Sequence, residues 1–175
     1  RIKIDYMKNS ILKEIIESIE KIPEETYNDF INEIKSHSRI FVWGLGRSGM
    51  VGKAFAMRLR HLGKESFFIG EICPPIDTND LLIIVSKTGK PGMLLPPIKA
   101  AKKAKACTLC ITAEKNHLTQ LCKKSFILNI PNSIQFGGCL FEQTVFIFFD
   151  EVVERYRKKE GISFMDMEKN HANWE

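Results

Sequence analysis

Residues 39–49 read RIFVWGLGRSG, and this stretch decides the fold. It begins with a short, mainly apolar run at 39–43 and turns glycine-rich at 44–49. From residue 48 to residue 62, apolar side chains recur at helical spacing, and Gly63 ends that pattern. A strand that leads through a tight glycine turn into a helix is the opening unit of a parallel α/β sheet.

The same alternation continues along the chain. Helical patterns recur near 97–105 and 116–123. Between them lie apolar runs of only four to six residues. Such short runs alternating with helices predict parallel strands buried between helices. The right-handed crossover rule puts those helices on both faces of the sheet. We therefore expect a three-layer α/β sandwich with a five-stranded parallel sheet. The four further strand candidates are 66–69, 81–85, 107–112 and 126–130.

Helices are expected at both ends of the chain. Two come first, at 10–22 and 24–35, and Pro23 separates them. The last third predicts one long helix at 138–159 and a polar tail at 170–175. The start of the long helix is apolar nearly all round, which predicts burial on most sides. It is either a central helix of one chain or a helix packed against another subunit.

The 175 residues, 44% of them hydrophobic, fit one domain with one sizeable core. We expect a single domain over 1–175, with N-terminal helices at 1–36, the sheet core at 37–135, and the long helix and tail at 136–175.

The net charge of +5 comes from lysine clusters on predicted helix surfaces without interleaved aromatic residues. We interpret these clusters as solvated helix faces and expect no nucleic-acid partner.

The five cysteines suit a reducing compartment. Their number is odd and no secretory leader is evident, so reduced thiols and a cytoplasmic location are expected. Cys107 and Cys110 lie three apart in a predicted strand and so face opposite sides. No second Cys/His pair completes a zinc set, so we expect no metal. No apolar stretch approaches the roughly 18 residues of a membrane span, so no membrane partner is expected.

Three strand ends carry candidate ligand loops, because open parallel sheets bind ligands beyond the carboxyl ends of their strands. They are GLGRSG at 44–49, GEICPP at 70–75 and SKTGKP at 86–91. The first matches GxGxxG, and Glu71 ends the next strand, which is also the context of a dinucleotide-binding turn. The chain has no room for a second substrate domain, however. Hydroxyls and lysines in the third loop suit a single phosphate. We favour a sugar phosphate over a dinucleotide or a plain tight turn.

These loops and several blocks around them resemble a known family, the sugar isomerase (SIS) family. Within it, the chain is similar to the 6-phospho-3-hexuloisomerase branch, from about Arg39 to the C-terminus. The matching blocks are GLGRSG at 44–49, FAMRL at 55–59, HLG at 61–63, GE at 70–71, DLLI at 80–83 followed by Ser86, FEQ at 141–143 and HAN at 171–173.

The resemblance implies a flavodoxin-like parallel sheet and a homotetramer. It implies conversion of 3-hexulose 6-phosphate into fructose 6-phosphate, a step of the ribulose monophosphate pathway of formaldehyde assimilation, with no metal or organic cofactor. The substrate- and phosphate-binding residues that it implies are Gly46, Arg47, Ser48, Glu71, Ser86, Lys87, Thr88 and Gly89.

The chain departs from the family's pattern at the proposed site. Where the family has SGSGxT, this chain has residues 86–91. Two hydroxyls remain at Ser86 and Thr88, whereas Lys87 and Pro91 replace a glycine and the final threonine. These changes leave two alternatives open: a sugar-phosphate sensor without turnover, and an isomerase of another sugar phosphate such as arabinose 5-phosphate. The other altered segments are ICP at 72–74 and QFGG at 135–138.

Moving a carbonyl between neighbouring carbons requires a base that removes a proton and returns it. Glu142, at the start of the long apolar helix, is the candidate base; the alternative is a carboxylate placed there only by the helix dipole. His171 is the candidate acid, since imidazole titrates near neutral pH; the alternative is a solvated tail residue. In an oligomer the tail could complete a neighbour's site.

Three further residues each have a binding role and an alternative. Arg47 could bind phosphate or cross an interface. Ser48 could bind a sugar hydroxyl or cap its helix, and Lys87 could bind phosphate or remain solvated.

Overall fold

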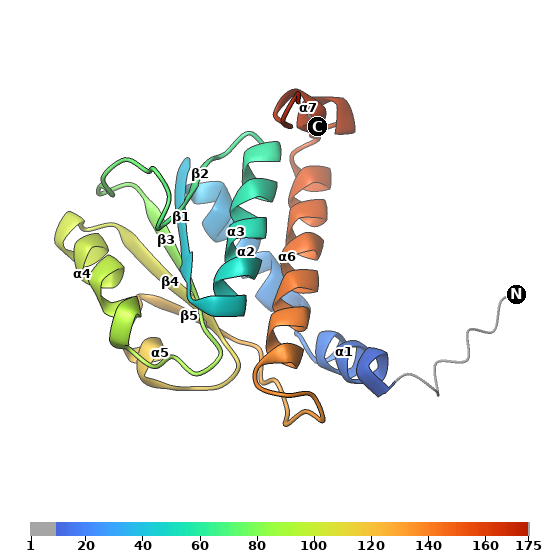
Figure 1. Cartoon of the computed structure of the whole chain (residues 1–175). Helices are drawn as coiled ribbons and strands as arrows, with labels where there is room; N and C mark the ends of the chain where they lie inside the picture. Colours follow the sequence, from blue (N-terminus) through green and yellow to red (C-terminus); the bar gives the residue numbers. More distant parts are fainter. Residues whose placement is uncertain (1–9, 175) are drawn as a thin grey trace, which may run out of the picture.

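The fold is built on one five-stranded, all-parallel sheet, as predicted. The structure, a computed structural model, describes residues 10–174. The strand order is β2-β1-β3-β4-β5, so β1 lies inside the sheet, with β2 added on one side of it and the remaining strands on the other (Figure 1). The strands are β1 Arg39–Gly44, β2 Glu65–Phe68, β3 Leu81–Val85, β4 Cys107–Thr112 and β5 Lys124–Ile127.

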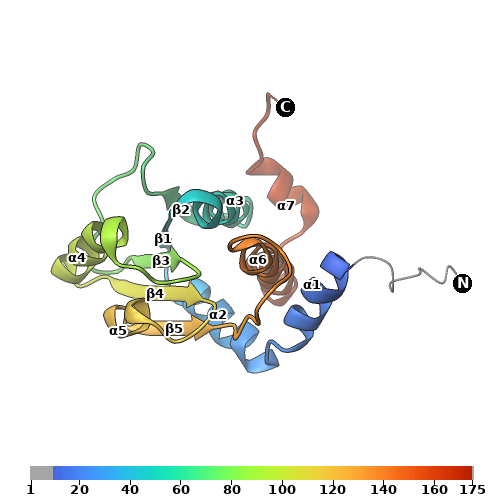
Figure 2. The same cartoon turned by 60° about the horizontal axis from the view of Figure 1, so that its bottom comes forward.

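Helices cover both faces of the sheet and complete the predicted three-layer sandwich (Figure 2). One face carries three long helices and the other carries two shorter ones, the first of which follows a 3-10 turn at Gly92–Leu94. The larger layer contains α2 Glu24–Ser36, α3 Gly46–His61 and α6 Cys139–Lys159. The smaller layer contains α4 Leu95–Ala104 and α5 His117–Leu121. Outside the layers, α1 Ser10–Glu20 packs on α6, and α7 Phe164–Lys169 packs on α3.

Two hydrophobic cores lie on the two faces of the sheet. The larger one, under α2, α3 and α6, contains a group of aromatic rings in which Phe55 stacks on Phe149 with centroids 3.9 Å apart. Cys107 packs against this core, whereas Cys110 belongs to the core under α4 and α5. The prediction that these two cysteines face opposite sides is therefore confirmed.

The long helix α6 is mainly a central helix of the chain. Phe141, Val145 and Phe148 are fully buried within the larger core. Only a narrow stripe of its apolar start faces outward, with Phe146 44% and Ile147 42% exposed. Burial on most sides is confirmed within the chain, and the stripe of Phe146 and Ile147 remains exposed.

Two elements differ from the prediction. Strand β5 spans Lys124–Ile127, whereas its apolar pattern predicted 126–130. It begins earlier because its first half is an exposed edge where polar residues are tolerated. Helix α7 was not predicted at all. Its signal is a capping box in which Ser163 and Asp166 bind each other's backbone N–H, each at 3.1 Å.

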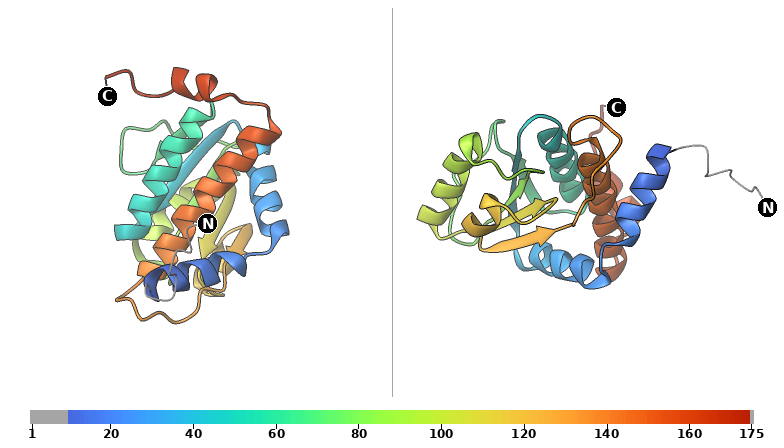
Figure 3. Two further views of the ribbon diagram at one scale, coloured as in Figure 1. Left: turned by 90° about the vertical axis from the view of Figure 1, so that its right-hand side faces the viewer. Right: turned by 90° about the horizontal axis from the view of Figure 1, so that it is seen from below.

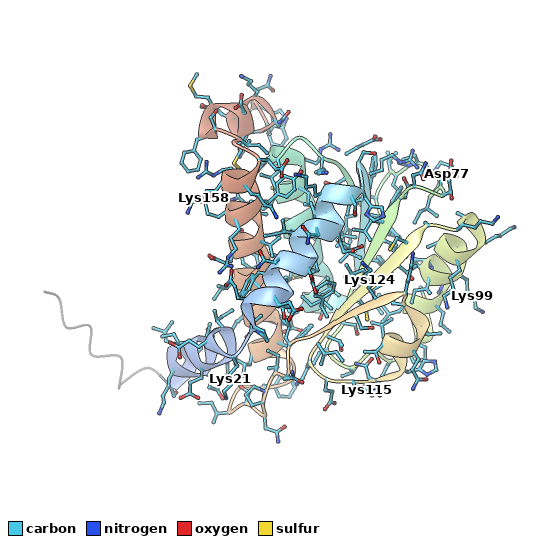
Figure 4. The ribbon with its side chains drawn as sticks, turned by 180° about the vertical axis from the view of Figure 1, so that it is seen from behind. Lys21, Asp77, Lys99, Lys115, Lys124 and Lys158 are labelled. Carbon is cyan, nitrogen blue, oxygen red and sulfur yellow. The ribbon has the colours of Figure 1, made fainter. Side chains whose placement is uncertain are left out.

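The lysines of the smaller layer are solvated, as predicted. Lys99, Lys102 and Lys103 on α4 are exposed, and Lys99 points away from the body of the protein (Figure 4). At the edge of the sheet, Lys124 forms an ion pair with Glu33 that joins strand β5 to α2 of the larger layer. Among the helices of residues 10–174, none is long and apolar enough to cross a membrane.

Candidate active site

The turn between β1 and α3 depends on two glycines in backbone contact. A Cβ added at Gly49 would lie 2.5 Å from the carbonyl oxygen of Gly44, and one at Gly44 would lie 2.9 Å from the carbonyl oxygen of Val85. Neither position accepts a side chain without moving backbone atoms. The missing side chains let α3 begin directly against the carboxyl edge of the sheet. The first turn of α3 is thereby fixed beside the loop that follows β3.

The residues after this turn meet Glu142, nearly a hundred positions later in the sequence. Ser48 Oγ donates to Glu142 Oε1 at 3.3 Å, and Arg47 Nε donates to Oε2 at 2.9 Å. No side chain caps the start of α3, where the N-cap is Leu45, so Ser48 contacts the carboxylate instead of serving as a cap. The structure therefore brings together three of the residues that the sequence singled out.

This carboxylate is buried and its charge is compensated. Glu142 is only 8% exposed, whereas the Arg47 side chain is 60% exposed. The hydrogen bond to Glu142 raises the pKa of Arg47, so the guanidinium stays charged at the mouth of the site. Gly138 leaves room for the carboxylate to fold back over the start of α6, since a Cβ there would lie 2.8 Å from Oε1. A buried carboxylate of this kind is well placed to exchange protons with a bound ligand.

The loop after β3 curls on itself next to this cluster. The backbone N–H of Gly89 donates to Ser86 Oγ at 3.2 Å. The ammonium of Lys87 donates to the carbonyl of Gly137 at 2.9 Å, which ties the loop to the segment that leads into α6. Thr88 is exposed. Hydroxyls, a lysine and a glycine turn thus gather at the carboxyl edge of the sheet, where an anion would be stabilised.

Thr112 and Asn116 hold the loop after β3 from behind, a role that the sequence did not indicate. Thr112 is fully buried, donates to the carbonyl of Lys87 at 3.0 Å and accepts from Asn116 Nδ2 at 2.6 Å. Asn116 also caps α5 by accepting from the N–H of Leu118 at 3.0 Å. The sequence pattern identifies Asn116 as a helix start, but no periodic signal shows that it backs the loop at Gly89.

His171 and Glu71 lie away from this cluster. The ring of His171 is 4.8 Å from that of His61 at the end of α3, whereas Ser48 lies at its start. Thirteen residues of helix separate those two positions, a distance of about 20 Å. Glu71 is exposed and forms an ion pair with Lys53.

The far end of α3 holds the histidine because α7 turns the tail there. Figure 1 shows α7 at the opposite end of the molecule from the starts of α3 and α6. Asn170, just after α7, donates to the carbonyl of His61 at 3.3 Å. Within one chain, the candidate base and the candidate acid therefore do not meet.

The described part of the chain contains no group of three His, Cys, Asp or Glu residues able to hold a metal ion. The cluster contains a buried carboxylate, a hydroxyl donor, an exposed guanidinium and a hydroxyl-rich loop. This set suits a small anionic ligand that carries exchangeable protons.

A family model described as the SIS domain matches residues 33–148, about two thirds of the chain. The chain belongs to the SIS-domain family. The matched segment includes the β1–α3 turn, the loop after β3 and Glu142. The SIS-domain assignment therefore covers the residues that the structure brings together, and it confirms the resemblance drawn from the sequence.

Several relatives are similar over most of their length. The 3-hexulose-6-phosphate isomerase of Bacillus subtilis is 34% identical over 94% of this chain and 95% of its own. That of Methanocaldococcus jannaschii is 33% identical over 83% of this chain and 82% of its own. A crystal structure of a Methanococcus jannaschii protein, described as inferring a function of 3-hexulose-6-phosphate isomerase, has a TM-score of 0.86 at 30% identity. It covers 94% of this chain and 96% of its own.

Proposed function

We propose that this SIS-domain protein is an isomerase that converts 3-hexulose 6-phosphate into fructose 6-phosphate. The observation that carries the proposal is the buried carboxylate of Glu142, which Ser48 and Arg47 hold beside the hydroxyl-rich loop. Support comes from relatives that bear this activity in their names and are similar over nearly their whole length.

The reaction needs one proton to move between neighbouring carbons. Glu142 removes the proton from C2 of the ketose, the C2–H electrons form the C2=C3 double bond, and the C3 carbonyl oxygen takes a proton to give an enediol. The C2 hydroxyl then releases its proton, its oxygen becomes the new carbonyl, and the carboxylic acid returns the proton to C3. One carboxylate placed over both carbons performs both transfers.

The neighbours of Glu142 have distinct roles in this scheme. Ser48 orients the carboxylate and can donate to a substrate oxygen once the substrate enters. Arg47, mostly exposed and charged, can leave the carboxylate and stabilise the oxyanion of the enediolate or the phosphate. The loop of Ser86, Lys87 and Thr88 binds the phosphate through hydroxyl and backbone donors.

We propose further that the protein is a homo-oligomer, a tetramer by resemblance, in which His171 serves the site of a neighbouring subunit. Support comes from its location. His171 lies against His61, which is about 20 Å along α3 from Ser48, the contact of Glu142, so His171 and Glu142 do not meet within one chain. The apolar stripe left uncovered on α6 offers one contact surface. His171 would donate a proton to the substrate oxygen there.

Mixing two inactive variants tests the shared site. Separately purified E142Q and H171N would be dissociated, mixed and reassembled. If His171 acts across the interface, some mixed sites carry both intact residues and activity returns. If mixing restores nothing although the mixed oligomers form, His171 does not complete a neighbour's site.

The direct test of the activity is a coupled assay. Ribulose 5-phosphate, formaldehyde and a hexulose-phosphate synthase generate the substrate, and formation of fructose 6-phosphate is followed. Turnover supports the proposal. Tight binding of fructose 6-phosphate without turnover would favour the sensor, and turnover of arabinose 5-phosphate alone would favour the other sugar.

We place the reaction in the cytoplasm, where the five free cysteines remain reduced. By resemblance, it would follow the fixation of formaldehyde in the ribulose monophosphate pathway.

A further inference from the structure

A carboxylate on α1 binds the loop that leads into α6. Glu14 Oε2 accepts from Ser133 Oγ at 2.9 Å and from Gln135 Nε2 at 3.1 Å. Its other oxygen, Oε1, accepts from the backbone N–H of Ile134 at 2.9 Å. Three consecutive residues of the loop therefore donate to a single side chain more than a hundred positions earlier in the sequence.

The same loop is tied to α6 by a second bond. Gln135 Nε2 also donates to Gln143 Oε1 at 2.9 Å, so both hydrogens of its amide are used. Figure 3 shows α1 running alongside this loop at the start of α6. Hydrogen bonds to a charged acceptor are about twice as strong as neutral ones. The contact is thus well suited to hold the loop in one conformation.

The residues that follow in this loop face the candidate active site. Gly137 supplies the carbonyl that binds Lys87 at 2.9 Å, and Gly138 borders the carboxylate of Glu142. Only Phe136 separates Gln135 from Gly137. A shift of the loop at Glu14 would therefore move the partner of Lys87 and the wall beside the base.

We propose that Glu14 is a positioning residue for the substrate site, acting through the loop of residues 133–138. It touches no substrate; it fixes the carbonyl that orients Lys87 and thereby the phosphate-binding end of the site. This inference rests on the proposed function for its kinetic readout, but the contact itself can be tested without turnover.

The first test is E14A, with E17A as the matched control on the same helix. Glu17 is an exposed α1 carboxylate that forms an ion pair with Lys13, with Nζ and Oε1 3.8 Å apart. We expect E14A to raise KM for the hexulose phosphate about tenfold, equivalent to about 1.4 kcal/mol. The value of kcat should change less than threefold, because Ser48 and Arg47 still hold Glu142. E17A should leave both parameters unchanged.

A rescue experiment separates positioning from a loss of folding. E14Q places an amide hydrogen against the amide of Gln135, and Q135E restores an acceptor there. The double variant E14Q/Q135E should recover at least part of the KM lost in E14Q. Failure of the rescue, or a normal KM in E14A, would overturn the proposal.

Amide hydrogen exchange provides the readout that needs no turnover. Loop 133–138 should lose protection in E14A but not in E17A, and equal protection in both would contradict the inference. If the wild-type protein shows no isomerase activity, the proposed function fails separately. The affinity for fructose 6-phosphate then replaces KM, and an E14A affinity equal to that of E17A would refute the role of Glu14.

Discussion

Replacing Gly89 with alanine should destabilise the loop after β3 in two separable ways. Gly89 has a φ of +59°, and a side chain in that left-handed region costs about 1–2 kcal/mol. In addition, the new Cβ would lie 2.1 Å from Oδ1 and 2.4 Å from Cγ of Asn116. The Asn116 side chain must move away, and α5 loses an N-cap worth about 1 kcal/mol. Together these effects lower the free energy of unfolding by about 2–3 kcal/mol, or roughly 4–12 °C in melting temperature.

Gly161 provides the matched control. It has a φ of +69° at the end of α6, with no atom within 4 Å of an added Cβ. G161A should therefore lower the free energy of unfolding only through its positive φ, by about 1–2 kcal/mol. Urea unfolding of both variants isolates the contribution of Asn116 as the difference between them.

A double-mutant cycle completes the test. In an N116A background the clash and the cap are both gone, so G89A should cost no more than G161A does in the wild type. The reasoning is refuted if G89A is no more destabilising than G161A in the wild type. It is equally refuted if G89A costs as much in N116A as in the wild type.

Three further changes have definite expected outcomes. G49A forces a Cβ to within 2.5 Å of the Gly44 carbonyl oxygen and should lower stability by about 3 kcal/mol in urea unfolding; an unchanged midpoint would contradict the close packing. S48A removes a hydrogen bond to Glu142, the proposed base, and should reduce kcat about tenfold, roughly 1.4 kcal/mol, with circular dichroism unchanged; full kcat would exclude an orienting role. Hydrogen bonds from the loop lower the pKa of Glu14, and the bond from the backbone N–H of Ile134 has the largest effect. Its hold on the loop should therefore be complete above about pH 4.3 and be lost as the pH falls through the lower folded pKa, measured as loop amide protection; protection that stays constant would contradict this sign.

Much of the fold could be predicted because local patterns determine it. Within residues 39–62, the spacing of apolar residues changes from that of a strand to that of a helix. Gly44 and Gly49 mark where the helix approaches the strand closely. Repetition of that unit is enough to predict a parallel sheet with helices on both faces. Part of the site could also be predicted. Ser48 and Glu142 both lie where helices begin at the carboxyl edge of the sheet, so the sequence places them at the same edge.

The supporting contacts could not be predicted in the same way. The bonds from residues 133–135 to Glu14 join segments about 120 positions apart, and a single glutamate on an amphipathic helix carries no periodic signal. Asn116 could be recognised as a helix cap, but its contact with Gly89 depends on how two loops meet in space. The position of His171 depends on α7, a six-residue helix whose only signal is the Ser163 capping box.

The most direct test of the central claim is solvent isotope exchange during turnover, compared between the wild type and E142Q. In deuterated water, the wild type should convert 3-hexulose 6-phosphate into fructose 6-phosphate with deuterium bound to carbon at C3. E142Q should fold normally and convert at least 100-fold more slowly, the lower bound for loss of a positioned base. Full activity in E142Q, or a well-folded wild type that binds fructose 6-phosphate but moves no proton, would contradict the assignment of Glu142 as the base of an isomerase.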